Sequence, residues 1–274
     1  MNSKFCTKNS ITSSTELTVS SGTNTRLLFD RRTDVQFSTS GETSGTRTIR
    51  WIPAATTTID TIVIQNCNWD AFTVTYNGGL DFSLPILCVG NTDKDLYITF
   101  DNVEIDTTNG VLLSITNTMT AGVEVKCGEL YIGLELFEAG AASDYTPKSK
   151  EFAFSHQLSD GTNFKVFIRE IINFDYVEHV VESAQWINYY DLKQRNKRET
   201  FFFVAKPVLP VNLSGVALPA NLDVSFVVGD YSTWNGLAGH YDFAVDFDIY
   251  QYEGNLQTNG YIVKGMMLQA GGVR

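Results

Sequence analysis

Two neighbouring runs decide the fold of the first half of the chain: Ile59-Asp60-Thr61-Ile62-Val63-Ile64-Gln65-Asn66-Cys67-Asn68-Trp69 and Ala71-Phe72-Thr73-Val74-Thr75-Tyr76-Asn77-Gly78-Gly79. In the second run, large apolar residues alternate with threonines, which is the period of a strand that buries one face. The run ends in Asn77-Gly78, a strong turn signal because glycine accepts a positive φ. These runs therefore predict short strands joined by tight turns.

Similar short runs extend outward in both directions. They predict strands at 25–30, 46–52, 58–65, 71–77, 95–100, 103–105, 111–115, 123–126 and 129–137, with Asp101-Asn102 as a turn. So many short strands without a helical run are typical of a β-sandwich or jelly roll.

The composition of the chain changes several times along its length, which suggests domain boundaries. We expect a flexible polar arm at 1–24, a sandwich at 25–138, a linker at 139–150, a second β-rich module at 151–254 and a C-terminal tail at 255–274. Glycine, small residues and a proline mark the linker. The expected fold class is mainly β, with one helix in the second module.

The second module opens with an expected hairpin, 152–157 with 164–172, which turns at Asp160-Gly161. A helix is predicted over 183–193, with Ser183 as its cap and Trp186, Ile187 and Tyr190 on its apolar face. The three consecutive aromatic residues Phe201-Phe202-Phe203 predict a strand that is covered on both faces.

The charge of the chain argues against nucleic acid as a partner. The formal net charge is −11, whereas phosphate binding needs clustered cations. The basic run at 193–198 is better explained as a solvated helix end. No window approaches the roughly 18 apolar residues of a membrane-spanning helix. The N-terminus lacks a signal-peptide core, so we expect synthesis in a cytosol and no membrane partner.

The four cysteines, Cys6, Cys67, Cys88 and Cys127, form no Cys-x-x-Cys pair and have no nearby histidine, so no metal site is expected. Cys88 and Cys127 lie in apolar runs that are typical of buried free thiols. A disulfide stays open as an alternative, although no spacing requires one.

No arrangement of residues predicts catalysis or a cofactor. The three histidines, His156, His179 and His240, belong to no nucleophile or metalloprotease motif. Asp242, Asp246 and Asp248 have the spacing of a solvated strand face, although a glycosidase pair would look similar. A calcium site with ligands from Asp101 and Asp106, or from Asp93 and Asp95, is a weaker alternative, since the chain has no calcium-loop motif. We therefore expect a protein that is not an enzyme.

Aromatic residues in loops are the candidate binding residues. Trp69 lies between two predicted strands, and Tyr231 and Trp234 lie in the polar run at 231–236. Loop aromatics on a rigid sandwich can stack on sugars or anchor a protein interface. Trp51 alternates within a strand and is expected in the core.

The runs Leu27-Leu28-Phe29-Asp30, Thr48-Ile49-Arg50-Trp51-Ile52, 59–69, 72–78 and Glu129-Leu130-Tyr131-Ile132-Gly133 resemble a discoidin-type jelly roll. Modules of this type recur in bacteriophage tail and neck proteins. The hairpin turn at 159–161, Phe174, the run 199–203 and the aromatic runs at 241–243 and 247–250 are similar to a partner module in such proteins.

This resemblance implies a structural component of a phage virion, in the tail, neck or baseplate, that is assembled in the host cytoplasm. Its implied partners are other virion proteins and copies of itself in a ring-like homo-oligomer. Many discoidin-type modules bind glycans, so a carbohydrate-binding module for host recognition is the alternative.

Overall fold

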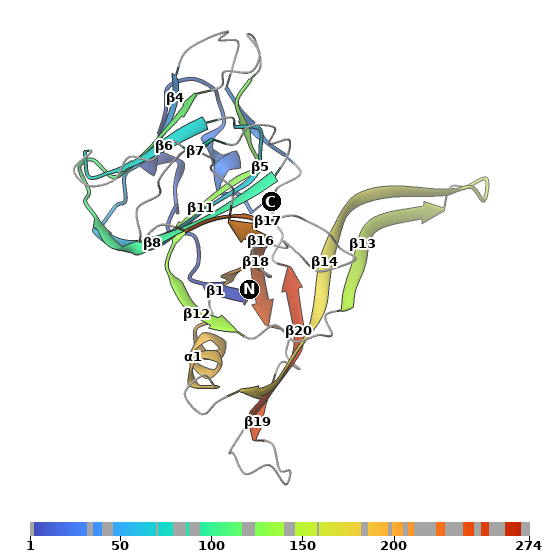
Figure 1. Ribbon diagram of the computed structural model, residues 1–274. Coiled ribbons are helices and arrows are strands. Elements are labelled where there is room, and N and C mark those ends of the chain that lie inside the picture. Colours follow the sequence, from blue (N-terminus) through green and yellow to red (C-terminus); the bar gives the residue numbers. More distant parts are fainter. Residues whose placement is uncertain are drawn as a thin grey trace. The chain divides into compact units, whose positions relative to one another are not determined.

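The structure is a computed structural model, and it describes residues 3–31, 35–39, 46–69, 71–78, 86–87, 94–116, 124–139, 146–157, 159–181, 186–196, 199–204, 208–210, 223–227, 238–243, 248–251 and 261–269. The chain folds into two compact units, whose elements Figure 1 labels. Unit 1 comprises Met1–Ala139, Phe201–Gly239 and Gly272–Arg274, and unit 2 comprises Gly140–Thr200 and His240–Gly271.

Unit 1 is built around two antiparallel five-stranded sheets, with strand orders β11-β5-β8-β17-β16 and β2-β4-β9-β6-β7. The first contains β5 (Thr57–Cys67), β8 (Lys94–Ile105), β11 (Glu129–Gly133), β16 (Val208–Pro210) and β17 (Asp223–Val227). The second contains β2 (Leu17–Val19), β4 (Thr46–Trp51), β6 (Ala71–Tyr76), β7 (Ile86–Leu87) and β9 (Val111–Thr116). Two 3-10 turns, η1 (Ser14–Glu16) and η2 (Thr25–Leu28), and the paired strands β3 (Phe37–Ser38) and β10 (Lys126–Cys127) lie alongside.

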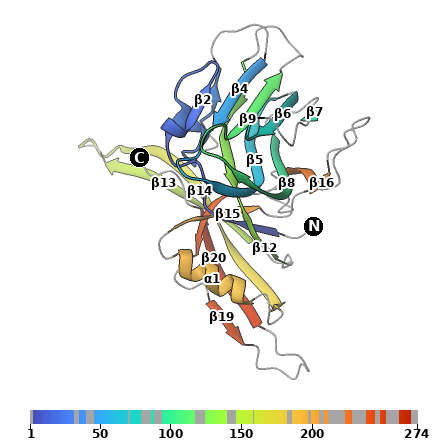
Figure 2. The ribbon, with the colours of Figure 1, turned by 90° about the vertical axis from the view of Figure 1, so that its left-hand side faces the viewer.

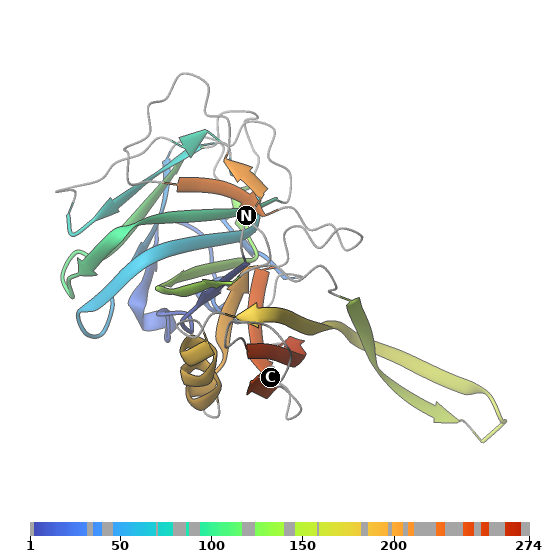
Figure 3. The ribbon, with the colours of Figure 1, turned by 60° about the horizontal axis from the view of Figure 1, so that its bottom comes forward.

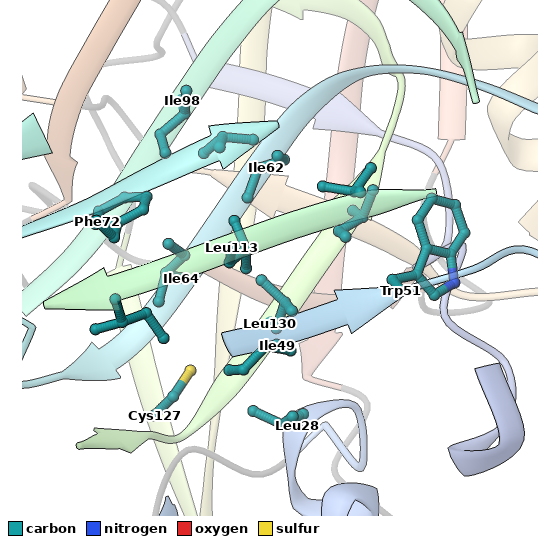
Figure 4. Close-up of a cluster of buried hydrophobic side chains, with 14 of the residues drawn as sticks. Leu28, Ile49, Trp51, Ile62, Ile64, Phe72, Ile98, Leu113, Cys127 and Leu130 are labelled. Atoms are coloured by element: carbon teal, nitrogen blue, oxygen red, sulfur yellow. The ribbon is translucent and has the colours of Figure 1, made fainter. Parts of the chain in front are cut away.

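Figure 2 shows the strands of these two sheets as ribbons. One hydrophobic core lies between the sheets, and Figure 4 shows some of its side chains. Ile62 and Ile64 of the first sheet and Ile49 and Leu113 of the second are all buried in it. The alternation within β5 that the sequence shows is what delivers Ile62 and Ile64 to the same face. The predicted mainly β fold with a sandwich in the N-terminal half is therefore confirmed.

A third layer covers the outer face of the first sheet. It consists of β12 (Glu135–Ala139), β1 (Ser3–Cys6) and β15 (Phe201–Val204), paired in that order. A second buried cluster lies here and includes Tyr131, Tyr97 and Phe202. The rings of Tyr131 and Phe202 stack with centroids 4.2 Å apart. On the other face of this layer, Phe5 packs against Phe203 at 4.8 Å.

The aromatic run in β15 confirms one sequence prediction. Phe201, Phe202 and Phe203 are all buried, although adjacent residues of a strand point to opposite faces. Both faces of β15 are therefore covered, as the run of three phenylalanines predicts.

Unit 2 consists of strands around β20 and one helix in its described residues. Its elements are β13 (Thr146–Gln157), β14 (Asn163–Val181), α1 (Trp186–Asn196), β18 (Ala238–Phe243), β19 (Asp248–Gln251) and β20 (Tyr261–Gln269). Strands β14, β18 and β19 all pair antiparallel with β20, and β13 pairs with β14. Helix α1 lies against β19 and β20.

The expected flexible arm at 1–24 is wrong. Phe5 and Cys6 of β1 are fully buried, and β2 pairs with β4 in the second sheet. The polar composition hid these strands because a three- or four-residue strand that is covered by other strands needs few apolar residues of its own.

The expected boundaries in the second half also change. Strand β12 reaches Ala139 and β13 begins at Thr146, so both ends of the expected linker at 139–150 are strand. Strands β15 and β17, expected in the second module, pair with β1 and β8 of unit 1. The expected tail at 255–274 contains β20, in which Val263 and Met267 are fully buried. Composition marks loops, but it does not show which strand a later segment joins.

Three predicted elements differ in type or extent. The expected strand at 25–30 is the 3-10 turn η2, which follows Asn24 at φ 63°. The expected turn at Asp101-Asn102 is absent because β8 continues there, with a register shift against β5 between its paired residues Thr99 and Val103. The expected strand at 129–137 divides at Leu134 because β11 pairs with β5 whereas β12 pairs with β1.

The predicted turn glycines are confirmed. Asn77 and Gly78 follow β6 with φ values of 47° and 83°, and Gly161 has a φ of 84° in the turn between β13 and β14. Asn77 also joins two loops, since its amide donates to the Glu104 carbonyl at 2.8 Å and accepts from the Asp106 N–H at 2.9 Å.

None of the helices in the described residues is both long enough and apolar enough to span a bilayer.

Gly110 is the position where the sandwich is least tolerant of a side chain. Its φ is 63°, and a Cβ there would overlap the carbonyl oxygen of Trp51 in the neighbouring strand. We expect Gly110→Ala to lower the free energy of unfolding by about 3 kcal/mol, from a left-handed backbone and displaced neighbours together. Urea unfolding followed by tryptophan fluorescence measures this loss.

Gly78→Ala is the matched control. Its φ is also positive, at 83°, but a Cβ there would meet only the flexible side chain of Asn109 at 3.3 Å. We expect a loss of about 1–2 kcal/mol for the left-handed backbone alone. Equal losses for the two variants would contradict the proposed overlap at Gly110.

Candidate functional site

The first candidate binding residue, Trp69, lies in the sandwich core. Its side chain is 0% exposed, and its ring meets Phe72 edge-on with centroids 5.2 Å apart. The preceding Asn68 explains why the loop turns inward, because its amide donates to the Glu124 carbonyl and accepts from the Lys126 N–H, both at 2.7 Å. The expectation of an exposed aromatic platform at Trp69 is therefore corrected. Trp51, expected in the core, is 1% exposed.

The other two candidates, Tyr231 and Trp234, lie outside the described residues. Their role as ligand or interface residues stays a prediction. Cys88 also lies outside, whereas Cys6, Cys67 and Cys127 are buried free thiols.

Of the acidic residues considered for calcium or catalysis, Asp101 and Asp106 have side chains that the structure describes. Those of Asp93, Asp95, Asp242, Asp246 and Asp248 lie outside the described part of the chain. Asp106 caps its own turn, because its carboxylate accepts the backbone N–H groups of Thr108 and Asn109. These hydrogen bonds hold the pKa of Asp106 below its usual value, and the one from the Asn109 N–H has the largest effect. Within the described ranges, no three His, Cys, Asp or Glu side chains are placed to hold a metal ion.

A polar cluster that the sequence did not predict lies where the third layer meets the first sheet. At its centre, Glu135 of β12 accepts a hydrogen bond from the Tyr97 hydroxyl at 2.8 Å and pairs with the Lys4 ammonium at 3.2 Å. These three residues come from β12, β8 and β1. Charge-assisted contacts of this kind are the stronger hydrogen bonds in proteins, so the cluster ties three strands together.

Asp60 of β5 extends the cluster. Its Oδ1 accepts from the Thr61 hydroxyl and from the Glu135 N–H, both at 2.7 Å. Burial raises the pKa of Asp60, and the hydrogen bonds from Thr61 and Glu135 offset part of that rise. A carboxylate that holds a backbone N–H of β12 fixes the register of that strand.

Cys6 and Tyr131 form the buried end of the cluster. The Tyr131 hydroxyl donates to the Thr7 carbonyl at 3.1 Å. Burial raises the pKa of the Cys6 thiol well above its usual value, and the negative charges of Glu135 and Asp60 make a smaller contribution in the same direction. A nucleophilic cysteine needs the thiolate, so this environment suits a structural thiol. The cluster therefore acts as a tie between strands, built from residues up to 131 positions apart in sequence.

A different kind of candidate lies in unit 2, where β13 and β14 extend beyond the sheet. Strand β20 pairs with β14 only from Asn173 to Val181. From there towards the turn, residues 149–157 pair with 163–172 and no third strand joins them in the described residues (Figure 3). We call this two-stranded part the β13–β14 ribbon. Nine paired residues give it a length of about 30 Å.

The register of the ribbon separates its residues into two faces. Phe154 lies opposite Val166, and the neighbouring pair on the same face is His156 with Phe164. The alternate face includes the pair Ser155 and Lys165. Since alternate residues of a strand belong to opposite faces, the register places Phe154, Phe164 and Val166 on one face. Ser155 and Lys165 belong to the other face, where Ala153 and Phe167 form the next pair.

Comparisons with known proteins complete the description. No protein-family model matches the chain, and no curated protein matches its sequence. Among solved structures, a chitosan-binding module from a chitosanase/glucanase of Paenibacillus sp. IK-5 is 13% identical, covers 43% of this chain and 92% of its own, and has a TM-score of 0.35.

Two further solved structures are similar at this level. A pectin-binding carbohydrate-binding module is 14% identical over 42% of this chain and 87% of its own, with a TM-score of 0.31. A chain described as CpGH89CBM32-6 from Clostridium perfringens is 15% identical over 45% of this chain and 97% of its own, with a TM-score of 0.26. The solved structures that the chain resembles are thus carbohydrate-binding modules, and the likeness assigns no ligand to this chain.

The polar cluster predicts a specific pH dependence for Asp60→Asn. Asparagine keeps the oxygen that accepts from Thr61 and Glu135 but removes the charge. Because the pKa of Asp60 is raised above 3.8 in the folded protein, its contribution to stability is fully present below that pH and is lost as the pH rises through the folded pKa. We therefore expect wild type to lose stability relative to Asp60→Asn as the pH rises from 3.8 through the folded pKa. Urea unfolding at a series of pH values measures this loss.

Asp106→Asn is the contrasting variant. The pKa of Asp106 is lowered, so its contribution is present above its usual pKa and is lost as the pH falls through the folded value. Wild type should therefore lose stability relative to Asp106→Asn on acidification. If wild type also lost stability relative to Asp60→Asn on acidification, the pKa of Asp60 would be lowered in the folded protein and not raised.

Proposed function

We propose that this chain is a non-catalytic structural protein that works by assembling with copies of itself and with other proteins. The observation that carries the proposal is the β13–β14 ribbon. A two-stranded ribbon without further cover is marginally stable in water. This one also has a long edge along β13, at the end of its sheet, and by register an apolar face at Phe154, Phe164 and Val166.

Both properties of the ribbon favour a protein partner. An open strand edge offers backbone N–H and C=O groups that another strand can pair with, and proteins commonly recognise one another in this way. An apolar face gains free energy when a partner removes it from water. Pairing along the edge of β13 together with cover over the apolar face would stabilise the ribbon and join the two molecules.

The test shortens the ribbon within the full chain. Glu151 and Glu170 lie opposite each other in register, so residues 152–169 can be replaced by an Asn-Gly turn while the pairing of β14 with β20 is kept. We expect wild type to form oligomers in light scattering after size exclusion, and the shortened chain to be monomeric with an unchanged melting temperature. A monomeric wild type, or a shortened chain that assembles equally well, contradicts the proposal.

A matched pair of point variants refines the test. Phe154→Lys places a charge on the apolar face of the ribbon, and Ser155→Lys places the same residue on the other face. We expect the first to weaken assembly more strongly than the second. Equal effects would point to the strand edge alone as the contact.

The finer form of the proposal is a component of a bacteriophage virion, in the tail, neck or baseplate, that is assembled in the host cytoplasm. It rests on the resemblance of 59–78 and the neighbouring runs to discoidin-type modules of virion proteins. Mass spectrometry of purified virions should then find this chain in fixed stoichiometry, and its absence from them would exclude this form.

A glycan-binding module is the second candidate. Its support is a rigid β-sandwich together with Tyr231 and Trp234, in a polar run between β17 and β18. Chitosan and pectin fragments are suitable first probes, followed by a glycan array. Tyr231→Ala and Trp234→Ala should remove any binding found, and binding that survives in both variants would exclude these residues as the site.

A further inference from the structure

Helix α1 presents an apolar face away from the residues that anchor it. Tyr189 and Leu192 are buried, at 1% and 4% exposed, and hold the helix in place. Ile187 and Tyr190 are 49% and 46% exposed, the two large hydrophobic side chains with this exposure in the described part of the chain. The sequence predicts one apolar face for Ile187 and Tyr190, and in the structure both of these side chains are exposed.

Trp186, which is half-buried, lies beside these two residues. Its ring meets that of Tyr190, one helical turn later, in an edge-on contact with centroids 6.0 Å apart. We call Trp186, Ile187 and Tyr190 the outer face of α1. Scattered exposed apolar residues are ordinary, but tryptophan and tyrosine grouped with an aliphatic neighbour are the composition of the energetic centre of a protein interface.

Charge indicates which partner fits the outer face. The last turn of α1 carries Lys193 and Arg195, whereas the whole chain has a formal net charge of −11. A basic helix end beside an apolar patch is complementary to an acidic surface. Another copy of the same chain carries an excess of negative charge, and opposite charges steer two molecules together and fix their orientation.

We propose that the outer face of α1 docks onto a second copy of this chain, with Ile187 and Tyr190 as the apolar anchors and Lys193 and Arg195 pairing with acidic residues of that copy. This contact is separate from the β13–β14 ribbon, since the two involve different elements. Because the basic end of α1 meets an acidic surface elsewhere on the copy, the contact is heterologous, and a heterologous contact closes into a ring or extends as a filament. The proposal rests on the proposed assembly function and deepens it.

The experiment measures self-association of the full chain by sedimentation velocity over a range of concentrations. The double variant Ile187→Ser with Tyr190→Ser changes exposed positions, so the melting temperature should stay that of wild type. We expect its dissociation constant for self-association to rise about tenfold or more, as is typical when interface anchors are truncated.

Charge reversal is an independent arm of the same experiment. Lys193→Glu with Arg195→Glu should weaken self-association and remove most of its dependence on sodium chloride, because salt screens charge pairs at an interface rim. Asp191→Asn is the matched control. It removes an exposed negative charge from the same helix and should leave association unchanged or slightly stronger.

Each outcome separates this inference from the proposed function. If wild type assembles and both double variants assemble equally well, the docking role of α1 is overturned while assembly through the ribbon stands. If wild type stays monomeric at every concentration, both fail. If the serine variant melts early, Ile187 and Tyr190 support the fold of unit 2, and the charge-reversal arm then decides the docking role alone.

Discussion

The architecture of unit 1 depends on the burial of both faces of one sheet. Along β5, Ile62 and Ile64 enter the core between the two sandwich sheets, while Val63 belongs to the cluster under the third layer. Strands β8 and β11 repeat this arrangement with Tyr97 and Tyr131 on the outer face. A strand that is apolar on both sides cannot leave one of them in water, so the sheet needs a cover beyond its sandwich partner.

That requirement explains why strands that are distant in sequence pair with one another in unit 1. Strand β1 at the start of the chain and β15 at 201–204 meet over the outer face, and β12 joins them from the end of the sandwich. The polar cluster follows from the same geometry, because the layers meet at their edges where Lys4, Asp60 and Glu135 can be partly hydrated and paired. Apolar contacts hold the centre of this interface, and hydrogen bonds set the register at its margin.

Local pattern predicts the strands well and their partners poorly. Strands β4, β5, β6 and β9 lie where the alternation places them, because one-face burial is a property of each run alone. The burial of Trp69 was not predictable, since it depends on Asn68 hydrogen bonding to a segment about 60 residues later. The buried side of α1 was missed for a similar reason. Trp186, Ile187 and Tyr190 have helical spacing, yet Tyr189 and Leu192 are the residues that pack.

The free-energy cost of apolar surface in water also applies to unit 2. In the described residues of unit 1, the apolar side chains on both faces of β5 are buried, and the aromatic run of β15 is buried on both sides. In unit 2 the register gives the β13–β14 ribbon an apolar face and an open edge, and α1 exposes Ile187 and Tyr190. Apolar surface is costly to leave in water wherever it lies, so the exposed apolar side chains of α1 suit this unit to a partner. This is the physical reason for placing both proposed assembly contacts in unit 2.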